Sequence, residues 1–154
     1  MTRSNAAAYE RELKEIFSKE NYLTVRAAGS HGVDLVILKG DRCFPIEVKS
    51  SAESTIRFSN ASNYANKQAK MMIEECKRSE LIPIYAFRLM NTNRGGLTQQ
   101  KWRIFTIPAL SYHLTEAYGR FREMIPKIRT SGNGGYIMKW NDGMTLPEFL
   151  RLIK

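Results

Sequence analysis

The stretch from residue 33 to residue 49 constrains the fold of this chain more than any other. It reads V-D-L-V-I-L-K-G-D-R-C-F-P-I-E-V-K, with apolar runs at Val33–Leu38 and Cys43–Val48. Gly40 and Asp41 lie between the two runs, and this dipeptide is typical of a two-residue hairpin turn. The stretch therefore predicts a hydrophobic antiparallel hairpin.

The register of this hairpin brings charged residues together. A turn at residues 40–41 pairs Lys39 with Arg42 and puts Asp34 directly opposite Glu47. Counting from the turn makes the two acids a non-hydrogen-bonded pair, whose Cα atoms approach to about 4.5 Å. Lys49 lies two residues beyond Glu47 and points to the same face. We therefore expect two carboxylates and one ammonium group at one end of the hairpin.

Carboxylates this close together need a compensating partner. Like charges opposite each other destabilise a sheet, so a shared proton, a cationic neighbour or a bound metal ion is required. Oxygen ligands suit a hard divalent cation, Mg²⁺ or Mn²⁺. Lys49 beside that cation would orient a water molecule or stabilise charge on a phosphate. The pattern is degenerate, and the alternative is a solvated strand end with ordinary surface charges.

The composition indicates one globular domain with a polyanionic partner. The chain has 154 residues, of which 43% are hydrophobic and 25% are charged, and this length supports a substantial core. Its 24 Lys and Arg against 15 Asp and Glu give a net charge of +9. Nucleic acid is the commonest partner of such a surface. An anionic membrane fits less well, because no basic amphipathic helix with a strong apolar face stands out.

Localisation is inferred from features that the sequence lacks. The N-terminus has no apolar leader, and no apolar run reaches transmembrane length. Cys43 and Cys76 have neither C-x-x-C nor zinc-site spacing, which favours free thiols in a reducing compartment. We therefore expect a cytoplasmic protein without a membrane partner, associated with the nucleoid, or in a host cytoplasm if a phage encodes it.

Helical and extended patterns alternate along the rest of the chain. Helices are expected at 5–19, 60–78 and 110–124, and strands at 22–28, 81–89, 101–107 and 136–140. Segments 50–59, 91–100 and 127–135 are expected to be loops, and residues 145–148 form a capping box for a final short helix. The strand, helix, strand order around 60–78 predicts that 81–89 runs parallel to 43–48.

Two polar residues fall on the apolar faces of predicted helices. Glu10 lies on the apolar stripe of helix 5–19 or at its margin, whereas Glu12 lies on the solvated side. Glu10 is either a boundary residue paired with Arg11 or Arg26, or a third carboxylate delivered to the hairpin. Gln68 lies among the Met and Tyr positions of helix 60–78, where a half-buried amide needs partners.

Four motifs stand out in the first two thirds of the chain, and they are Ala8-Tyr9-Glu10-Arg11-Glu12-Leu13, Val25-Arg26-Ala27-Ala28-Gly29-Ser30, Val33-Asp34-Leu35-Val36 and Ile46-Glu47-Val48-Lys49. In these motifs the chain resembles the archaeal-type Holliday junction resolvases of the PD-(D/E)xK nuclease superfamily. The resemblance covers roughly residues 5 to 107 with family-like spacing. It implies an α/β restriction-endonuclease-like core, with a central mixed β-sheet flanked by helices. We place this core at residues 1–108 and a C-terminal extension, packed on the same domain, at 109–154.

The resemblance also implies a metal-dependent active site. In the family, the residues that form this site match Glu10, Asp34, Glu47 and Lys49, and those that assist at the phosphate match Arg26 and Ser30. Gln68 matches a Gln that borders the site in bacterial relatives. The expected ligands of Mg²⁺, or of Mn²⁺ in its place, are Glu10, Asp34, Glu47 and the Val48 carbonyl. His31 and Gly32 depart from the family, in which this loop is usually basic.

The implied activity is hydrolysis of phosphodiester bonds in four-way DNA junctions, by paired symmetric nicks from a homodimer. The residues expected to contact DNA are Arg3, Arg11, Arg26, Ser30, His31, Arg57 and Lys67. Two alternatives stay open. One is another endonuclease of the superfamily, of restriction type or specific for forks or flaps, and the other is a DNA-binding protein without catalytic activity.

Overall fold

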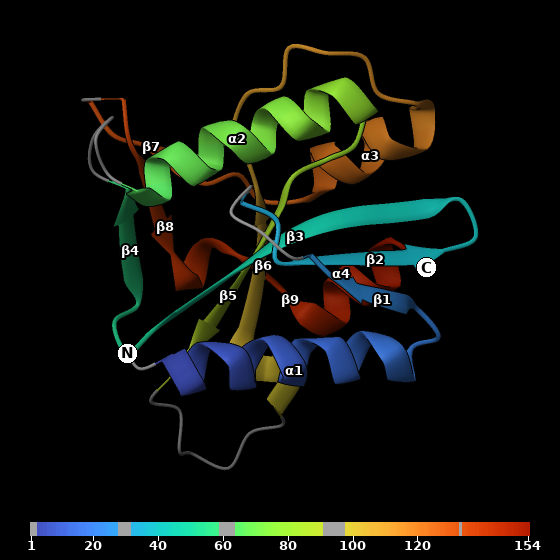
Figure 1. The fold of residues 1–154 in the computed structure, drawn as a ribbon. Helices are drawn as coiled ribbons and strands as arrows, with labels where there is room; N and C mark the ends of the chain where they lie inside the picture. Colours follow the sequence, from blue (N-terminus) through green and yellow to red (C-terminus); the bar gives the residue numbers. More distant parts are fainter. Residues whose placement is uncertain (1–2, 28–31, 59–63, 91–97, 133) are drawn as a thin grey trace.

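A mixed β-sheet lies at the centre of the molecule, with helices packed around it (Figure 1). The computed structural model describes residues 3–27, 32–58, 64–90, 98–132 and 134–154. The helices are α1 (Arg3–Lys19), α2 (Tyr64–Ser79), α3 (Glu116–Met124) and α4 (Leu146–Leu152), with short 3-10 turns at Thr98–Lys101 and Trp140–Asp142. This arrangement confirms the predicted fold class.

The strands form two sheets. The main sheet has the order β1-β2-β3-β5-β6-β9, and a smaller sheet has the order β4-β8-β7. Strands of the main sheet are β1 (Leu23–Arg26), β2 (Leu35–Lys39), β3 (Arg42–Ser51), β5 (Ile84–Leu89), β6 (Trp102–Thr106) and β9 (Met144–Thr145). Those of the small sheet are β4 (Thr55–Phe58), β7 (Arg129–Thr130) and β8 (Tyr136–Lys139). The C-terminal extension thus contributes strands to both sheets.

The predicted hairpin is present, with one difference in its register. β2 and β3 pair from Lys39 with Arg42 to Leu35 with Ile46, as the turn requires. Asp34, however, precedes β2, and its amide donates to the carbonyl of Ile46, which already pairs with Leu35. Two residues of one strand thus face one residue of the other, which is the arrangement of a β-bulge. The prediction of a regular pair between Asp34 and Glu47 is therefore wrong.

The strand after α2 runs in the predicted direction. β5 is parallel to β3, with Tyr85 in register with Glu47, and β6 is antiparallel to β5, with Phe105 in register with Tyr85. Because in-register neighbours in a sheet point to the same side, Glu47, Tyr85 and Phe105 share one face of the main sheet.

Two predicted loops and one predicted helix differ from the structure. Segment 50–59 contains the end of β3 and all of β4, and segment 127–135 contains β7. β4 pairs with β8, which lies far from it in the sequence, so a local pattern does not reveal β4. β7 has only two residues and is too short to produce a periodic pattern. Helix α3 begins at Glu116 instead of residue 110, because the Thr115 side chain accepts a hydrogen bond from the Tyr118 amide and caps the helix there. The capping interaction predicted for α4 is confirmed, since Thr145 Oγ1 accepts from the Glu148 amide at 3.2 Å.

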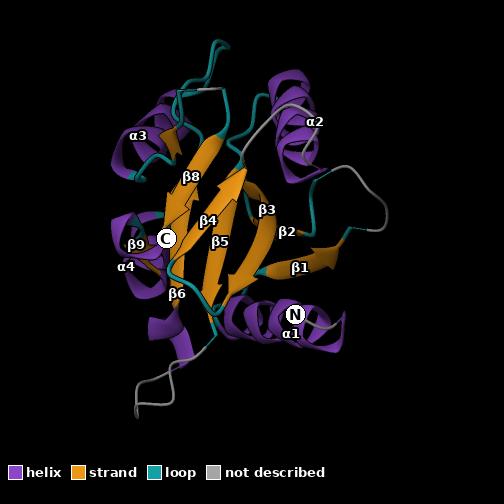
Figure 2. Ribbon diagram, turned by 90° about the vertical axis from the view of Figure 1, so that its left-hand side faces the viewer, coloured by secondary structure: helices purple, strands orange, loops and turns teal. Residues whose placement is uncertain are grey.

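Two hydrophobic clusters pack against the main sheet. The larger one joins α1, α3 and α4 to residues such as Phe44, Ile46 and Trp102, and the other joins α2 and the small sheet to Tyr85 and Phe105. In Figure 2, α2 lies on one side of the strands, and α3 and α4 lie on the other. Glu47 faces the α2 side of the sheet.

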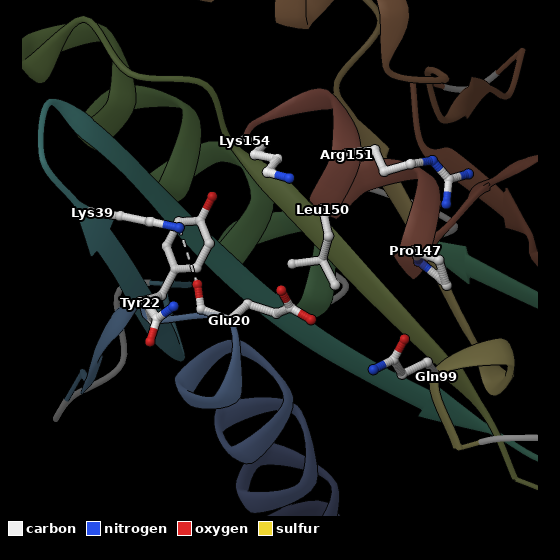
Figure 3. A pocket seen from close by; sticks show the side chains of 9 residues that line it. Glu20, Tyr22, Lys39, Gln99, Pro147, Leu150, Arg151 and Lys154 are labelled. Atoms are coloured by element: carbon white, nitrogen blue, oxygen red, sulfur yellow. Dashed lines mark hydrogen bonds between the residues drawn. The ribbon is translucent and has the colours of Figure 1, made fainter.

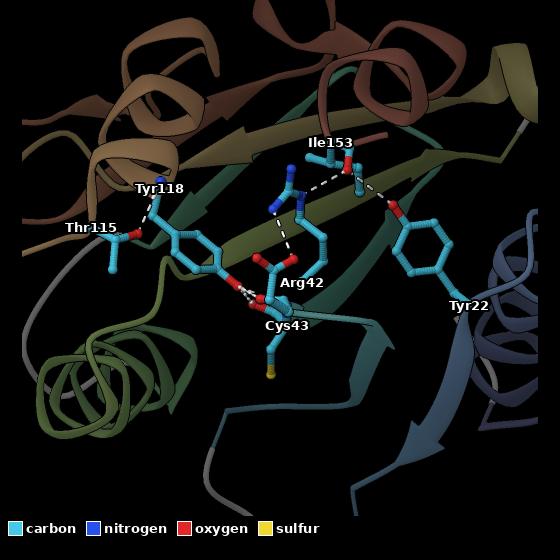
Figure 4. Close-up of polar contacts among 7 residues, drawn as sticks. Tyr22, Arg42, Cys43, Thr115, Tyr118 and Ile153 are labelled. Carbon is cyan, nitrogen blue, oxygen red and sulfur yellow. Dashed lines mark hydrogen bonds and ion pairs between the residues drawn. The ribbon is translucent and has the colours of Figure 1, made fainter.

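Hydrogen bonds join the C-terminal extension to the hairpin (Figure 4). The Tyr118 hydroxyl accepts from the Cys43 amide at 2.8 Å. Near the end of the chain, the Ile153 carbonyl accepts from Arg42 Nε at 3.2 Å and from the Tyr22 hydroxyl at 3.4 Å. The extension therefore packs directly on the strands that carry the acidic residues.

Within the described part of the chain, no helix combines the length and the apolar character needed to cross a bilayer.

Candidate active site

A cavity of about 270 Å³ brings most of the predicted catalytic and metal-binding residues together. Its lining consists of Ala6, Glu10, Asp34, Glu47, Val48, Lys49, Ser50 and Gln68. These residues come from α1, the bulge before β2, β3 and α2. Three carboxylates, one ammonium group and one amide thus converge on a single cavity.

The bulge fixes the position of Asp34. Its Oδ2 accepts a hydrogen bond of 2.7 Å from the Val48 amide, so the carboxylate is tied to β3. Burial raises the pKa of Asp34, while this hydrogen bond and the nearby Lys49 act in the opposite direction. The hydrogen bond from the backbone therefore holds the Asp34 carboxylate in a buried position, where its ionised form is less favourable than in water.

Glu47 is the most deeply buried acid of the site, with a relative exposure of 3%. Its Oε1 lies 3.3 Å from Lys49 Nζ. Burial raises the pKa of Glu47 from 4.5 to about 7, against the charge of Lys49 and a hydrogen bond from Tyr85, while Asp34 adds to the rise. Among the described residues, its Oε2 has no hydrogen-bond partner of ordinary geometry. Glu47 thus presents a buried oxygen that still lacks a full set of partners.

Glu10 reaches the cavity from the first half of α1. Both readings of this residue hold, because it lines the cavity and also lies 3.7 Å from Arg26 Nε. Burial raises the pKa of Glu10, and Asp34 raises it further, whereas Arg26 lowers it. The effect of Asp34 on the pKa of Glu10 shows that the two carboxylates lie within electrostatic reach of each other.

Gln68 borders the cavity because α2 packs tightly against the segment before Asp34. Gly32 has a φ of 81°, and a Cβ atom on it would lie 2.5 Å from the backbone oxygen of Gln68. A glycine is therefore needed at this position, both for the backbone conformation and for the close approach of α2.

The donor set of the cavity fits a hard divalent cation. Glu10, Asp34 and Glu47 offer carboxylate oxygens, which are the ligands that Mg²⁺ and Mn²⁺ prefer. One of these oxygens, Glu47 Oε2, is buried and lacks a full set of hydrogen-bond partners. In this conformation, however, no three acidic, His or Cys side chains of the described residues stand close enough to share one ion. A cation held by three of these side chains would therefore require their adjustment.

Other predicted residues lie outside the cavity or outside the described residues. Ser30 and His31 fall outside the described residues, and Arg3 starts α1 with an undescribed side chain. Arg26 stands at the margin, with its side chain 68% exposed and near Glu10. The remaining candidates are all exposed, on α1, β4 and α2, and they are Arg11, Arg57 and Lys67. Their DNA contacts stay predictions.

Two residues have environments that the sequence did not indicate. Tyr85 is fully buried in register with Glu47 and lowers the pKa of that acid, and its position follows from the β3–β5 register. Glu12 was expected on the solvated side of its helix, which is wrong. Its carboxylate is half-buried and accepts from Arg88 Nε at 2.9 Å and from Trp102 Nε1 at 2.8 Å, so it anchors α1 to the sheet.

A second cavity, of about 430 Å³, lies between the end of α1 and α4 (Figure 3). Its lining consists of Glu20, Asn21, Tyr22, Lys39, Gln99, Pro147, Leu150, Arg151 and Lys154. Lys39 donates to the Glu20 carbonyl at 3.2 Å there. No predicted site residue lines this cavity.

Comparison with known proteins places the chain in a family. A model of the archaeal Holliday junction resolvase (Hjc) family matches residues 1–118. Crossover junction endodeoxyribonuclease Hjc of Methanocaldococcus jannaschii is 38% identical over 48 residues, which are 31% of this chain and 36% of that protein. The chain thus aligns with about a third of the length of this curated relative.

The fold gives a second, independent likeness. The structure of Hjc, a Holliday junction resolvase from Archaeoglobus fulgidus, matches with a TM-score of 0.62 at 18% identity, covering 94% of each chain. The family match spans most of this chain and includes all of its cavity residues. The protein therefore belongs to the archaeal Holliday junction resolvase family.

Proposed function

We propose that this protein is an endonuclease that uses a divalent cation to resolve four-way DNA junctions by paired nicks. Mg²⁺ is the expected cation, and Mn²⁺ is expected to substitute for it. The substrate is carried over from the names of the relatives, a Holliday junction resolvase and a crossover junction endodeoxyribonuclease.

The convergence of Glu10, Asp34 and Glu47 beside Lys49 is the observation that carries this proposal. A protein that only binds DNA gains nothing from three carboxylates in one cavity, because they repel both each other and phosphates. Burial of a carboxylate beside other acids is, by contrast, a frequent feature of catalytic sites.

Each cavity residue has a proposed task. Asp34, Glu47 and the Val48 carbonyl would hold the cation, with Glu10 completing the set. Bound there, the cation would supply Lewis-acid activation of water and charge compensation at the phosphate. Lys49 Nζ orients the attacking water and donates to a phosphate oxygen, and the Arg26 guanidinium offsets the remaining phosphate charge. Gln68, on α2, contributes a polar amide to the wall of the cavity.

The proposed active form is a homodimer. A four-way junction has two equivalent strands to cut, and a two-fold dimer presents two equivalent cavities to them. Nicks placed symmetrically on two strands of opposite arms are the expected product, and they leave two nicked duplexes.

The test is cleavage of a synthetic four-way junction with and without Mg²⁺, with both nick positions mapped by strand-specific labels. Duplex, flap and fork substrates of the same sequence separate a junction resolvase from its relatives with other substrates. Asp34→Asn and Glu47→Gln should bind the junction but lose cleavage by about two orders of magnitude or more. Glu15→Gln changes an exposed acid on α1 and serves as the control.

Three outcomes would reject parts of the proposal. Normal cleavage by Asp34→Asn in Mg²⁺ rejects the metal site. Equal cleavage of duplex and junction rejects the substrate. A single nick per junction, together with a monomeric mass in light scattering, rejects the paired action of a dimer.

A further inference from the structure

The small sheet has one apolar and one basic face. Pairing across β4, β8 and β7 aligns Arg57, Ile137 and Arg129 in one row, and Thr55 with Lys139 in the next row on the same side. We call these five residues the outer face. The alternate positions, which include Ile56, Tyr136 and Met138, point to the opposite side.

The apolar side is covered by the rest of the protein. Met138 is fully buried, and Ile56 and Tyr136 pack in the same cluster as Ala69 and Met72 of α2. Figure 1 shows β4, β7 and β8 beside the end of α2 that begins at Tyr64. The outer face therefore points away from the core, and Arg57 and Arg129 on it are both exposed.

The charge of the outer face is positive. The strands β4, β7 and β8 contain two arginines and one lysine but no acidic residue. One carboxylate lies at the edge: Asp142 accepts from Arg129 at 2.7 Å and 2.9 Å. The three cations outnumber this acid, and Ile137, which lies between the two arginines, carries no charge.

The outer face is connected to the candidate active site through two elements. β4 follows directly on β3, which carries Glu47 and Lys49, and the short segment between them contains only Ala52, Glu53 and Ser54. The apolar side of the small sheet packs on α2, which carries Gln68. Both connections fix the outer face relative to the carboxylates. Strands β7 and β8 lie beyond residue 118, where the family match ends.

We propose that the outer face is a docking surface for the phosphate backbone of a duplex DNA arm, with Arg57, Lys139 and Arg129 as its cations. This inference rests on the proposed function and adds a second contact region to it, built largely by the C-terminal extension. Long basic side chains on the face of a sheet suit a row of phosphates, because contacts to phosphates do not depend on the base sequence.

The experiment measures binding of a fluorescent four-way junction in EDTA, over a series of salt concentrations. Arg57→Glu and Lys139→Glu should each weaken binding about tenfold and lower the salt slope by about 1, because each removes a phosphate contact. Arg151→Glu is the matched control: it makes the same charge change in the extension, at an exposed position of α4 on the far side of the main sheet. Single-turnover cleavage at saturating protein should be unchanged in Arg151→Glu.

The proposal is overturned if Arg57→Glu and Lys139→Glu weaken binding no more than Arg151→Glu does. Such a result would mean that the outer face affects DNA binding only through its contribution to the net charge of the protein. Melting temperatures check that the variants are folded, and Arg57→Ala with Lys139→Ala replace any reversal that fails to fold. Because the binding measurement needs no cleavage, an inactive wild-type protein would contradict the nuclease proposal without deciding this one.

Discussion

The Val48 amide donates a 2.7 Å hydrogen bond to Asp34 Oδ2 across the bulge. The residue whose carbonyl is a proposed cation ligand thus also positions the neighbouring carboxylate with its amide. One peptide segment of β3 therefore organises two of the expected ligands, and a change at Asp34 can be designed to keep this bond.

Asp34→Asn should weaken cation binding while leaving the stability of the fold almost unchanged. An asparagine oxygen can still accept from Val48, and the buried charge is gone, so the free energy of unfolding should fall by less than about 1 kcal/mol or rise. Affinity for Ca²⁺ or Mn²⁺, measured by calorimetry without DNA, should drop at least about tenfold. Asp34→Leu, which cannot accept the bond, should destabilise the protein markedly in urea. Equal cation affinity in Asp34→Asn and the wild type would speak against the metal site.

Tyr85→Phe should weaken cation binding without disturbing the fold of the sheet. The hydroxyl lowers the pKa of Glu47, so its loss favours the protonated acid and raises the half-saturating Mg²⁺ concentration by about tenfold. Tyr112→Phe is the control, because that hydroxyl bonds the Leu81 carbonyl at 2.6 Å and none of the cavity residues. An unchanged Mg²⁺ requirement in Tyr85→Phe would show that the hydroxyl has no part in cation binding.

The pH dependence of stability should report on Glu47. Its pKa is raised to about 7 in the folded protein by burial, above the ordinary 4.5, so the folded state holds this proton more tightly than the unfolded one. The resulting stabilisation is complete below the ordinary pKa and is lost as pH rises through about 7. Glu47→Gln should therefore gain stability relative to the metal-free wild type between about pH 5 and about pH 8. Urea unfolding in EDTA measures this, and parallel curves for the two proteins would contradict a raised pKa.

Gly32→Ala should be much more damaging than Gly40→Ala. Both glycines have positive φ, but a Cβ on Gly32 meets Gln68 at 2.5 Å, while Gly40 has nothing within 4 Å. The expected losses in unfolding free energy are about 3 kcal/mol for Gly32→Ala and about 1 kcal/mol for Gly40→Ala. Similar losses in urea unfolding would mean that α2 can move away from the segment before Asp34.

The sequence was sufficient for the features set by local periodicity. The hairpin turn, the shared face of Glu47 and Lys49, and the inward position of Glu10 all follow from strand and helix repeats, and the structure contains them. The catalytic roles of these residues stay predictions.

Features that depend on distant pairing were beyond local patterns. The bulge at Asp34 interrupts a register that a simple count extends. Tyr85 lies beside Glu47 because β3 and β5 pair in parallel, and the register of this pairing cannot be predicted from the sequence of either strand alone. Glu12 is held by Arg88 and Trp102, whose places on the sheet are fixed only when the strands assemble.

Strand β9 pairs with β6 at Arg103 and Ile104, at the end of the main sheet opposite β1. An unpaired edge as apolar as W-R-I-F-T would recruit other polypeptides and favour aggregation. By placing two residues of its own along this edge, the segment after residue 108 covers part of β6, which limits the edge available for such self-association independently of any role in binding DNA.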